Sequence, residues 1–281
     1  LKRVRDGHMD GYPWYTEARV RKMNRPNELL EGARSVISLA TSYLGDDPDT
    51  ADGMKGRVAR YSWGDDYHNV LKGRLQEFCN GLPAIVGRPV RHRIFVDDGP
   101  MNDRAAARRS GVGWFGKNTN ILTPSHGSWV LLGQVVTDLD LEPDDPLKKT
   151  CGSCVRCIDD CPTGAIVAPY VVDNTRCISY LTIELRGTVP RNLRPLMGDW
   201  IFGCDICQDV CPVNIKAISG ETAEFKQRNG FSTPDLVPIL EMDQETFSKK
   251  YRNSPIKRAK LRGLQRNACI ALGNNRDPRA I

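Results

Sequence analysis

Eight of the ten cysteines in this 281-residue chain lie between Cys151 and Cys211, and their spacing constrains the fold more than any other feature. The first run follows the pattern C-x2-C-x2-C-x3-C-P and consists of Cys151, Cys154, Cys157, Cys161 and Pro162. This pattern is typical of bacterial proteins with two [4Fe–4S] clusters, in which the fourth cysteine ligates the neighbouring cluster. Three thiolates on one tight loop can hold three corners of a cubane, whereas the fourth lies one turn further on and points away.

The second run repeats this spacing with one cysteine missing. It consists of Cys204, Cys207, Cys211 and Pro212, and Ile201 stands where a first cysteine would fall. Cys177 is the one cysteine of the region that remains unassigned. We therefore expect two crossed clusters. The ligands of the first would be Cys151, Cys154, Cys157 and Cys211, and those of the second would be Cys161, Cys177, Cys204 and Cys207.

Two other interpretations of these cysteines compete with this one. Paired C-x2-C motifs can hold structural zinc, but a zinc site does not require the C-x2-C-x2-C-x3-C-P run. Disulfides would require an oxidising compartment, and cysteines this regularly spaced usually bind metal. The remaining cysteines, Cys79 and Cys269, lie in apolar helical stretches and are expected to be buried.

Charge is unevenly distributed along the chain. The net charge is +6, and residues 249–281 contain ten Lys and Arg but one acid, Asp277. Such a segment favours a polyanionic partner such as nucleic acid, although a solvated helical face would have the same pattern. Five side chains at helical spacing are candidate phosphate contacts: Lys257, Arg258, Lys260, Arg262 and Arg266.

Apolar periodicity predicts an α+β protein. Strands are expected at 35–43, 93–96, 119–123 and 128–137, and helices at 67–79 and 103–110, the latter capped by Asp103. This alternation predicts a sheet layered with helices over residues 1–140. A helix capped by Asp173 is expected to run through Cys177. After Cys211 the chain is expected to be wholly helical, like the start of an α-solenoid.

Further motifs accompany the cysteines: Val96-Asp97-Asp98-Gly99-Pro100, the glycine-dense Gly111-Val112-Gly113-Trp114-Phe115-Gly116-Lys117-Asn118, and Arg266-Asn267-Ala268 followed by Ala271-Leu272-Gly273-Asn274. Together with the lone Cys177, this combination resembles epoxyqueuosine reductase, a family of cobalamin-dependent tRNA-modifying enzymes. The resemblance covers essentially the whole chain. The cysteine pattern is its most specific part.

The resemblance implies reduction of the epoxide of epoxyqueuosine to the alkene of queuosine at the wobble base of tRNA, by a corrinoid and two [4Fe–4S] clusters. It implies a nitroreductase-related cobalamin-binding α/β domain at 1–140, a ferredoxin-like two-cluster domain at 141–220 and HEAT-like tRNA-binding helices at 221–281. The chain starts at Leu1 rather than Met, so we expect both ends to be trimmed relative to the family.

The resemblance also implies the partners, which are a tRNA anticodon stem-loop and an external electron donor. We expect a monomer without membrane attachment. Cluster assembly needs a reducing compartment and no signal-like segment follows Leu1, which favours the cytoplasm.

In the family motif the aspartate that matches Asp97 is the proton donor, and from the residues alone Asp97 and Asp98 are equal candidates. A proton donor at neutral pH would need a carboxyl pKa raised by burial, for example beside an apolar corrin face. Candidate cobalamin contacts are Arg60, Tyr61, Tyr67, His68, Asp97, Gly116, Lys117 and Asn118. His68 could equally be a surface histidine at a helix start. No D-x-H-x-x-G motif is present, so we expect a base-off cobalamin without a histidine ligand.

Two alternative functions remain open from the sequence. A corrinoid reductive dehalogenase shares cobalamin and a two-cluster module, but the basic segment is better explained by a tRNA substrate. A plain electron carrier would need the clusters alone and would leave about 140 N-terminal residues and the basic segment without a use.

Overall fold

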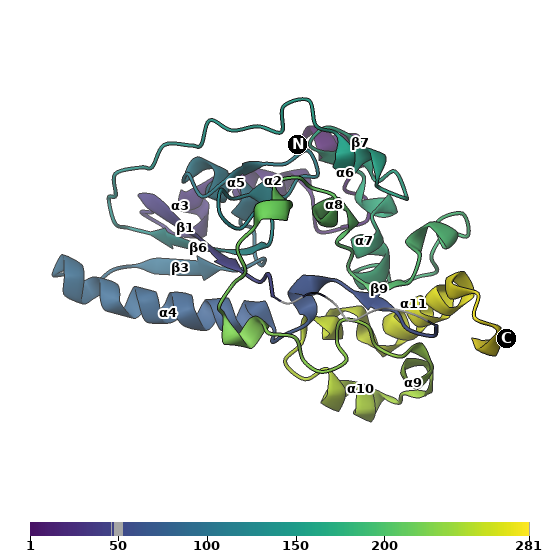
Figure 1. Ribbon diagram of the computed structural model, residues 1–281. Coiled ribbons are helices and arrows are strands. Elements are labelled where there is room, and N and C mark those ends of the chain that lie inside the picture. The colour runs from purple at the N-terminus through teal and green to yellow at the C-terminus, as the bar shows by residue number, and fades with distance from the viewer. Residues whose placement is uncertain (46, 48–52, 281) are drawn as a thin grey trace.

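The computed structural model describes residues 1–45, 47 and 53–280, and in this part of the chain it combines helices with one three-stranded sheet and three two-stranded sheets (Figure 1). The strands are β1 (Ser35–Ser42), β2 (Arg57–Val58), β3 (His92–Phe95), β4 (Trp114–Phe115), β5 (Ile121–Leu122), β6 (Val130–Thr137), β7 (Ile166–Ala168), β8 (Val171–Val172) and β9 (Trp200–Phe202). The α-helices are α1 (Lys2–Arg5), α2 (Glu17–Lys22), α3 (Pro26–Leu29), α4 (Tyr67–Val86), α5 (Asp103–Arg109), α6 (Arg156–Asp159), α7 (Ile178–Ile183), α8 (Ile206–Asp209), α9 (Leu236–Glu241), α10 (Gln244–Lys250) and α11 (Lys260–Asn275).

The main sheet has the antiparallel order β1-β6-β3 and helices on both faces (Figure 1). Successive side chains of a strand point to opposite faces. Val135 accordingly joins the core beneath α4, whereas Val136 packs with Phe95 and Ala106 beneath α3 and α5. The layered sheet predicted from the sequence is therefore present.

Helix α4 covers one face of this sheet and leads away from the site described below. The Asp66 carboxylate accepts the His68 amide at 3.1 Å and caps its first turn, and Gly87 ends it with φ +71°. Leu71, Leu75 and Cys79 are buried, as their spacing predicts.

A second core joins all three parts that the sequence suggests. Strand β2 pairs in parallel with β9 from the cysteine region, and α11 packs against β9. The shared core contains Val58, Phe202 and Leu264, all almost fully buried. The boundaries at residues 140 and 220 stay predictions, but the three parts are joined by common packing.

Several local predictions are wrong. Asn102 rather than Asp103 caps α5, because its carboxamide oxygen accepts the Ala105 amide. Thr119 has φ +70°, which shortens the expected strand to Ile121–Leu122. The expected helix from Asp173 is broken at Cys177, because Asp173 caps a 3-10 turn (Asn174–Arg176) and α7 starts only at Ile178.

Cys269 is exposed rather than buried, because it lies on the outer face of α11. The chain after Cys211 is not wholly helical either, since residues 226–235 form turns and bends between the 3-10 turn Ala223–Phe225 and α9. No helix in the described ranges has both the length and the apolar character needed to cross a bilayer.

Candidate functional site

The two cysteine runs come together across the interface of α6 and α8, which pack against each other. A small cavity there is lined by four cysteines from both runs: Cys151, Cys154, Cys157 and Cys211. The pKa of the Cys157 thiol is raised to about 11, chiefly by burial and next by the charges of Cys151, Cys211 and Cys154. The structure thus groups the thiols that the crossed assignment gives to the first cluster.

The second set of four lies deeper in the protein. The pKa of Cys207 is raised well above its ordinary value, chiefly by burial and next by the charge of Cys177, with smaller contributions from Asp205, Cys157 and Cys161. The pKa of Cys204 is raised by burial and next by the charge of Cys207. Partly buried thiols whose pKa is raised in this way become thiolates most readily beside a metal cation, so the residues present fit an iron–sulfur cluster.

A single metal ion does not fit these cysteines. Within residues 1–45, 47 and 53–280, no three His, Cys, Asp or Glu side chains converge closely enough to hold one ion. Structural zinc needs four ligands around a single centre at about 2.0–2.3 Å. Thiols spaced around a cavity instead suit the corners of a cubane.

The turn Gly116-Lys117-Asn118, which the sequence suggests for cobalamin, lines the cavity of the first cysteine set. Lys117 Nζ donates to the Gly152 carbonyl at 2.8 Å, and Asn118 Nδ2 donates to the Cys207 carbonyl at 3.1 Å. A Cβ on Gly116 would lie 2.6 Å from Asn118 Oδ1, so a larger residue there would displace the Asn118 carboxamide. These contacts brace both cysteine loops, and the cobalamin role of this turn stays a prediction.

Asp97 follows β3 in a left-handed conformation, with φ +48°, that non-glycine residues seldom adopt. The Tyr67 hydroxyl donates to Asp97 Oδ2 at 2.6 Å. Burial, and next the charge of Asp97, raises the pKa of Tyr67 well above its ordinary value, so its hydroxyl remains a donor. The Asp97 side chain is exposed, so the burial that its predicted role requires must come from bound ligands.

Asp98 differs from Asp97 in its partners. It accepts Lys72 Nζ at 2.6 Å and the Val96 amide at 2.9 Å. Although burial opposes it, these two hydrogen bonds hold the pKa of Asp98 below its ordinary value. Asp98 is thus a charged, structural carboxylate, and Asp97 is the better candidate for a proton donor.

A row of aromatic rings leads from Asp97 to the second cysteine set. The rings of Tyr67 and Tyr61 meet edge to face at 5.9 Å between centroids, and Tyr61 packs against Phe202 at 6.2 Å. A Cβ on Gly203, which precedes Cys204, would lie 3.4 Å from the Tyr61 ring. Tyr67 and Tyr61 thus form an aromatic layer that contacts Asp97 on one side and the backbone directly before Cys204 on the other.

Arg60 and His68 have protein partners in place. The Arg60 guanidinium lies 4.8 Å from the Trp63 ring centroid and 5.4 Å from that of Trp129. His68 stacks on Tyr67 at 4.1 Å, and its Nδ1 is 2.7 Å from the capping carboxylate of Asp66. This is the helix-start role that the sequence left open for His68.

The surroundings of Asp97 contain two buried polar atoms that lack a partner within the described residues, Arg19 Nε and Asp103 Oδ1. Arg19 Nη2 donates to the Gly99 carbonyl beside Asp97 at 2.5 Å. Burial, and next the charge of Asp97, raises the pKa of Asp103 to about 7. Buried polar groups are normally hydrogen-bonded. A large ligand with many amides would satisfy such atoms, so these residues fit a corrinoid.

Two buried polar residues near the clusters were missed by sequence reasoning. Asp205 accepts the Arg60 amide at 2.7 Å and Gln208 Nε2 at 3.1 Å, and burial raises its pKa to about 7. Gln208 Oε1 in turn accepts the hydroxyls of Tyr43 and Ser128. In the sequence, the one indication of a role for Asp205 and Gln208 is that each directly follows a cysteine, Cys204 or Cys207.

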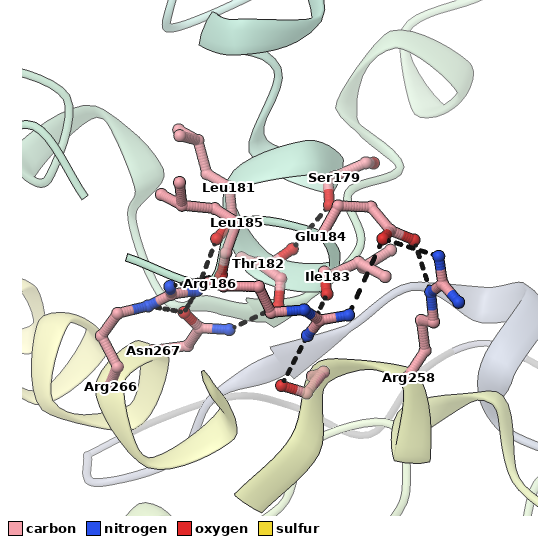
Figure 2. Close-up of polar contacts among 11 residues, drawn as sticks. Ser179, Leu181, Thr182, Ile183, Glu184, Leu185, Arg186, Arg258, Arg266 and Asn267 are labelled. Carbon is pink, nitrogen blue, oxygen red and sulfur yellow. Dashed lines mark hydrogen bonds and ion pairs between the residues drawn. The ribbon is translucent and has the colours of Figure 1, made fainter. Parts of the chain in front are cut away.

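The basic segment divides into two kinds of side chain (Figure 2). Lys257, Lys260 and Arg262 are exposed, in keeping with the predicted phosphate contacts. Arg258 is exposed too, but it forms two hydrogen bonds with Glu184 at 2.8 and 2.9 Å.

Arg266 is instead half-buried against α7 and the loop that follows it. Its guanidinium donates to the carbonyls of Leu181, Leu185 and Gly187 at 2.6–2.7 Å, and Figure 2 shows the first two of these residues. All of these acceptors belong to the protein backbone. The structure therefore contradicts the phosphate contact expected from Arg266, which is used to hold α11 on the cysteine region.

Arg266→Ala is expected to lower the apparent Tm of the cluster-loaded protein by about 5 °C. The change leaves three partly buried carbonyls without their charged donor, a loss of about 3 kcal/mol that corresponds to such a shift in a chain of this size. Anaerobic thermal unfolding followed by circular dichroism measures it. The matched control is Arg262→Ala on the exposed face of the same helix, which should shift Tm by less than about 1 °C. Equal shifts for both variants would contradict the structural role of Arg266.

Family models match two stretches of the chain. One, described as epoxyqueuosine reductase QueG, DUF1730, matches residues 24–98, and one for a 4Fe-4S double cluster binding domain matches residues 150–214. Among curated relatives, the epoxyqueuosine reductase of Xanthomonas campestris pv. campestris is 41% identical over 90% of this chain and 72% of its own length. That of Cellulophaga algicola is 40% identical over 95% of this chain and 86% of its own length.

Solved structures of the same name superpose on nearly the whole chain. An epoxyqueuosine reductase from Bacillus subtilis, with its catalytic aspartate loop swung out of the active site, has a TM-score of 0.91 and 33% identity over 99% of this chain and 75% of that chain. An epoxyqueuosine reductase with a tRNA-Tyr epoxyqueuosine-modified stem loop has a TM-score of 0.90 and 34% identity over the same shares.

Proposed function

This chain belongs to the epoxyqueuosine reductase family, and we propose that it reduces the epoxide of epoxyqueuosine in tRNA to the alkene of queuosine. The reaction consumes two electrons and two protons and releases the epoxide oxygen as water. The observation that carries the proposal is the juxtaposition of Asp97 with the deeper cysteine set through Tyr67 and Tyr61. It brings a proton donor and a source of electrons to one site. A plain electron carrier would not need the proton donor, and a dehalogenase would not need the basic segment.

The iron–sulfur part of this proposal rests on the double-cluster domain matched over residues 150–214. We assign one cluster to Cys151, Cys154, Cys157 and Cys211, and the other to Cys161, Cys177, Cys204 and Cys207. The second set is the deeper one and faces the aromatic layer, so it is the one that passes electrons to the substrate site. The first set, nearer the surface, receives them from an external donor.

We further propose that the site takes a base-off cobalamin without a histidine ligand. When bound, the corrinoid supplies the low-potential cobalt that delivers electrons to the substrate. Tyr61, Tyr67 and the unpartnered atoms of Arg19 and Asp103 would hold it. The finer fold relationships, a nitroreductase-related first part and HEAT-like last helices, belong to the same proposal.

Asp97 would protonate the oxygen that leaves carbon. The Tyr67 hydroxyl already donates a hydrogen bond to Asp97 Oδ2. Asp97 Oδ1 is therefore the carboxyl oxygen that would carry the proton toward the substrate. Bound corrinoid and base would cover the exposed carboxyl and keep bulk water away from it.

An anaerobic assay tests the function directly. The cluster-loaded protein is mixed with cobalamin, a chemical reductant and tRNA that carries epoxyqueuosine, and the product nucleoside is identified by mass spectrometry. Conversion to queuosine that depends on cobalamin supports the proposal, and a bound corrinoid whose EPR spectrum lacks a nitrogen ligand supports the base-off form. A cluster-loaded, corrinoid-bound protein that leaves the epoxide intact would refute it.

The exposed bases Lys257, Lys260 and Arg262 are proposed to meet tRNA phosphates. Replacing all three by Gln should lower the slope of log K against log salt by about two to three, because each lost phosphate contact removes a little under one unit. Salt titrations of anticodon stem-loop binding measure the slope. Arg88→Gln is the matched control, since Arg88 follows the end of α4 that points away from α11 (Figure 1). An unchanged slope in the triple variant would make the segment only a solvated face.

A further inference from the structure

One tryptophan of this protein is exposed where the others are buried. Trp14 has 39% of its surface accessible, whereas Trp63, Trp114, Trp129 and Trp200 have 4–7%. Its ring lies 5.1 Å from that of Tyr12, which in turn meets Tyr180 edge to face at 5.6 Å. Trp14 is thus the outer member of an aromatic cluster that is anchored on α7.

The segment that carries Trp14 bridges the two halves of the proposed site. On one side, the Gly11 amide donates to Asn174 Oδ1 at 3.1 Å, in the turn just before Cys177. On the other side, Arg19 Nη2 donates to the Gly99 carbonyl, two residues after Asp97. Trp14 lies between these anchors in the sequence, in a segment that is held at one end beside the turn before Cys177 and at the other beside the turn that contains Asp97.

A cation stands beside the exposed ring. The Arg258 guanidinium lies 5.8 Å from the Trp14 ring centroid, within the range of a cation–π contact. Glu184 orients that guanidinium through two hydrogen bonds, and Arg258 precedes the exposed bases Lys260 and Arg262. An exposed indole beside an oriented cation supplies the parts of a stacking platform for single-stranded nucleic acid.

We propose that Trp14 stacks with an unpaired anticodon nucleotide that flanks the modified base, while Arg258 contacts its phosphate. This inference rests on the proposed function. The modified base must leave its stack to reach Asp97, and its neighbour then loses a stacking partner. Sequence-specific proteins commonly receive such unstacked loop bases on aromatic side chains. Trp14 supplies that surface at the point where the loop enters.

Tryptophan fluorescence tests this contact without reference to turnover. Because the other four indoles are buried, a change in emission on adding anticodon stem-loop RNA would come mainly from Trp14. We expect strong quenching in the unaltered protein and little quenching in Trp14→Phe, although this variant should still bind the RNA. Equal quenching in both proteins would overturn the proposal.

Trp14→Ala is expected to raise the Kd of the stem-loop and the KM of the epoxyqueuosine tRNA about tenfold, which is the scale of one lost stacking contact. The kcat should change by less than twofold, and Trp14→Phe should recover most of the affinity. Phe78→Ala is the matched control, because Phe78 is a similarly exposed aromatic (41%) on the outer face of α4.

The outcomes separate this proposal from the proposed function. If the unaltered protein reduces epoxyqueuosine tRNA while Trp14→Ala binds and turns over the same RNA with unchanged Kd and KM, Trp14 serves only to pack against Tyr12 and the platform does not exist. If the unaltered protein itself neither binds nor reduces that RNA, the proposed function fails first and the platform falls with it.

Discussion

Asp97→Asn is expected to lower kcat for epoxyqueuosine tRNA by about 10²–10⁴-fold, the usual contribution of a general acid. Asparagine is the appropriate replacement, because it tolerates the left-handed conformation of Asp97 and can still accept the Tyr67 hydroxyl. The variant therefore removes the proton and leaves the turn intact. Single-turnover assays with reduced, cobalamin-loaded protein measure the loss, and the corrinoid spectrum should show unaltered cofactor binding.

Asp98→Asn supplies the matched control in the same turn. Its side-chain oxygen can still accept the Val96 amide, and it loses only the ion pair with Lys72, which is partly exposed. We expect kcat within about threefold of the unaltered protein. Equal losses in the two variants would indicate that the turn, rather than one proton of Asp97, is what the reaction needs. Unchanged turnover in Asp97→Asn would remove Asp97 from the mechanism.

The sequence predicted well those features for which the spacing of apolar residues along the chain is compatible with few local structures. The layered sheet over β1, β3 and β6 follows from apolar alternation, and α4 follows from the three- and four-residue steps of Leu71, Leu75 and Cys79. The crossed assignment of the cysteines stays a prediction; it rests in the same way on the missing position at Ile201, and the cavity lined by Cys151, Cys154, Cys157 and Cys211 agrees with its first set. For the sheet and for α4, a periodic local pattern specifies the structure.

The sequence could not show which partner a polar side chain finds across the fold. Arg266 belongs to the same basic segment as its neighbours, yet its guanidinium donates to three backbone carbonyls that are far from it in sequence. Lys117 and Asn118 suit a phosphate by residue type, but the fold turns them onto the cysteine loops. Trp14 belongs to no periodic pattern in the sequence, and its proposed role depends on its contacts with Tyr12 and Arg258 in the folded chain. Such contacts depend on chain segments far apart in sequence.

Cys211→Ala is expected to lower the iron content from about eight to about four per chain and to empty the cluster of the other run. Cys211 follows Cys204 and Cys207 in sequence but lines the cavity of Cys151 and Cys154. Crossed ligation therefore predicts that Cys211→Ala and Cys154→Ala leave the same cluster behind. Iron analysis and the EPR spectrum of the anaerobically reduced proteins measure both consequences.

The comparison with Cys207→Ala makes the pairing decisive. If each run held its own cluster, Cys211→Ala would have the EPR spectrum of Cys207→Ala; with a crossed pair it must match Cys154→Ala instead. Cys161→Ala reverses the test, because it should resemble Cys207→Ala. Cys269→Ala, an exposed thiol on α11, should retain both clusters and controls for loss of a cysteine as such. The proposed electron path runs from the cluster of Cys204 and Cys207 through Tyr61 to the substrate. Cys211→Ala should therefore still reduce substrate with a small chemical reductant that reaches this cluster, but not with a protein donor that delivers electrons through the other cluster.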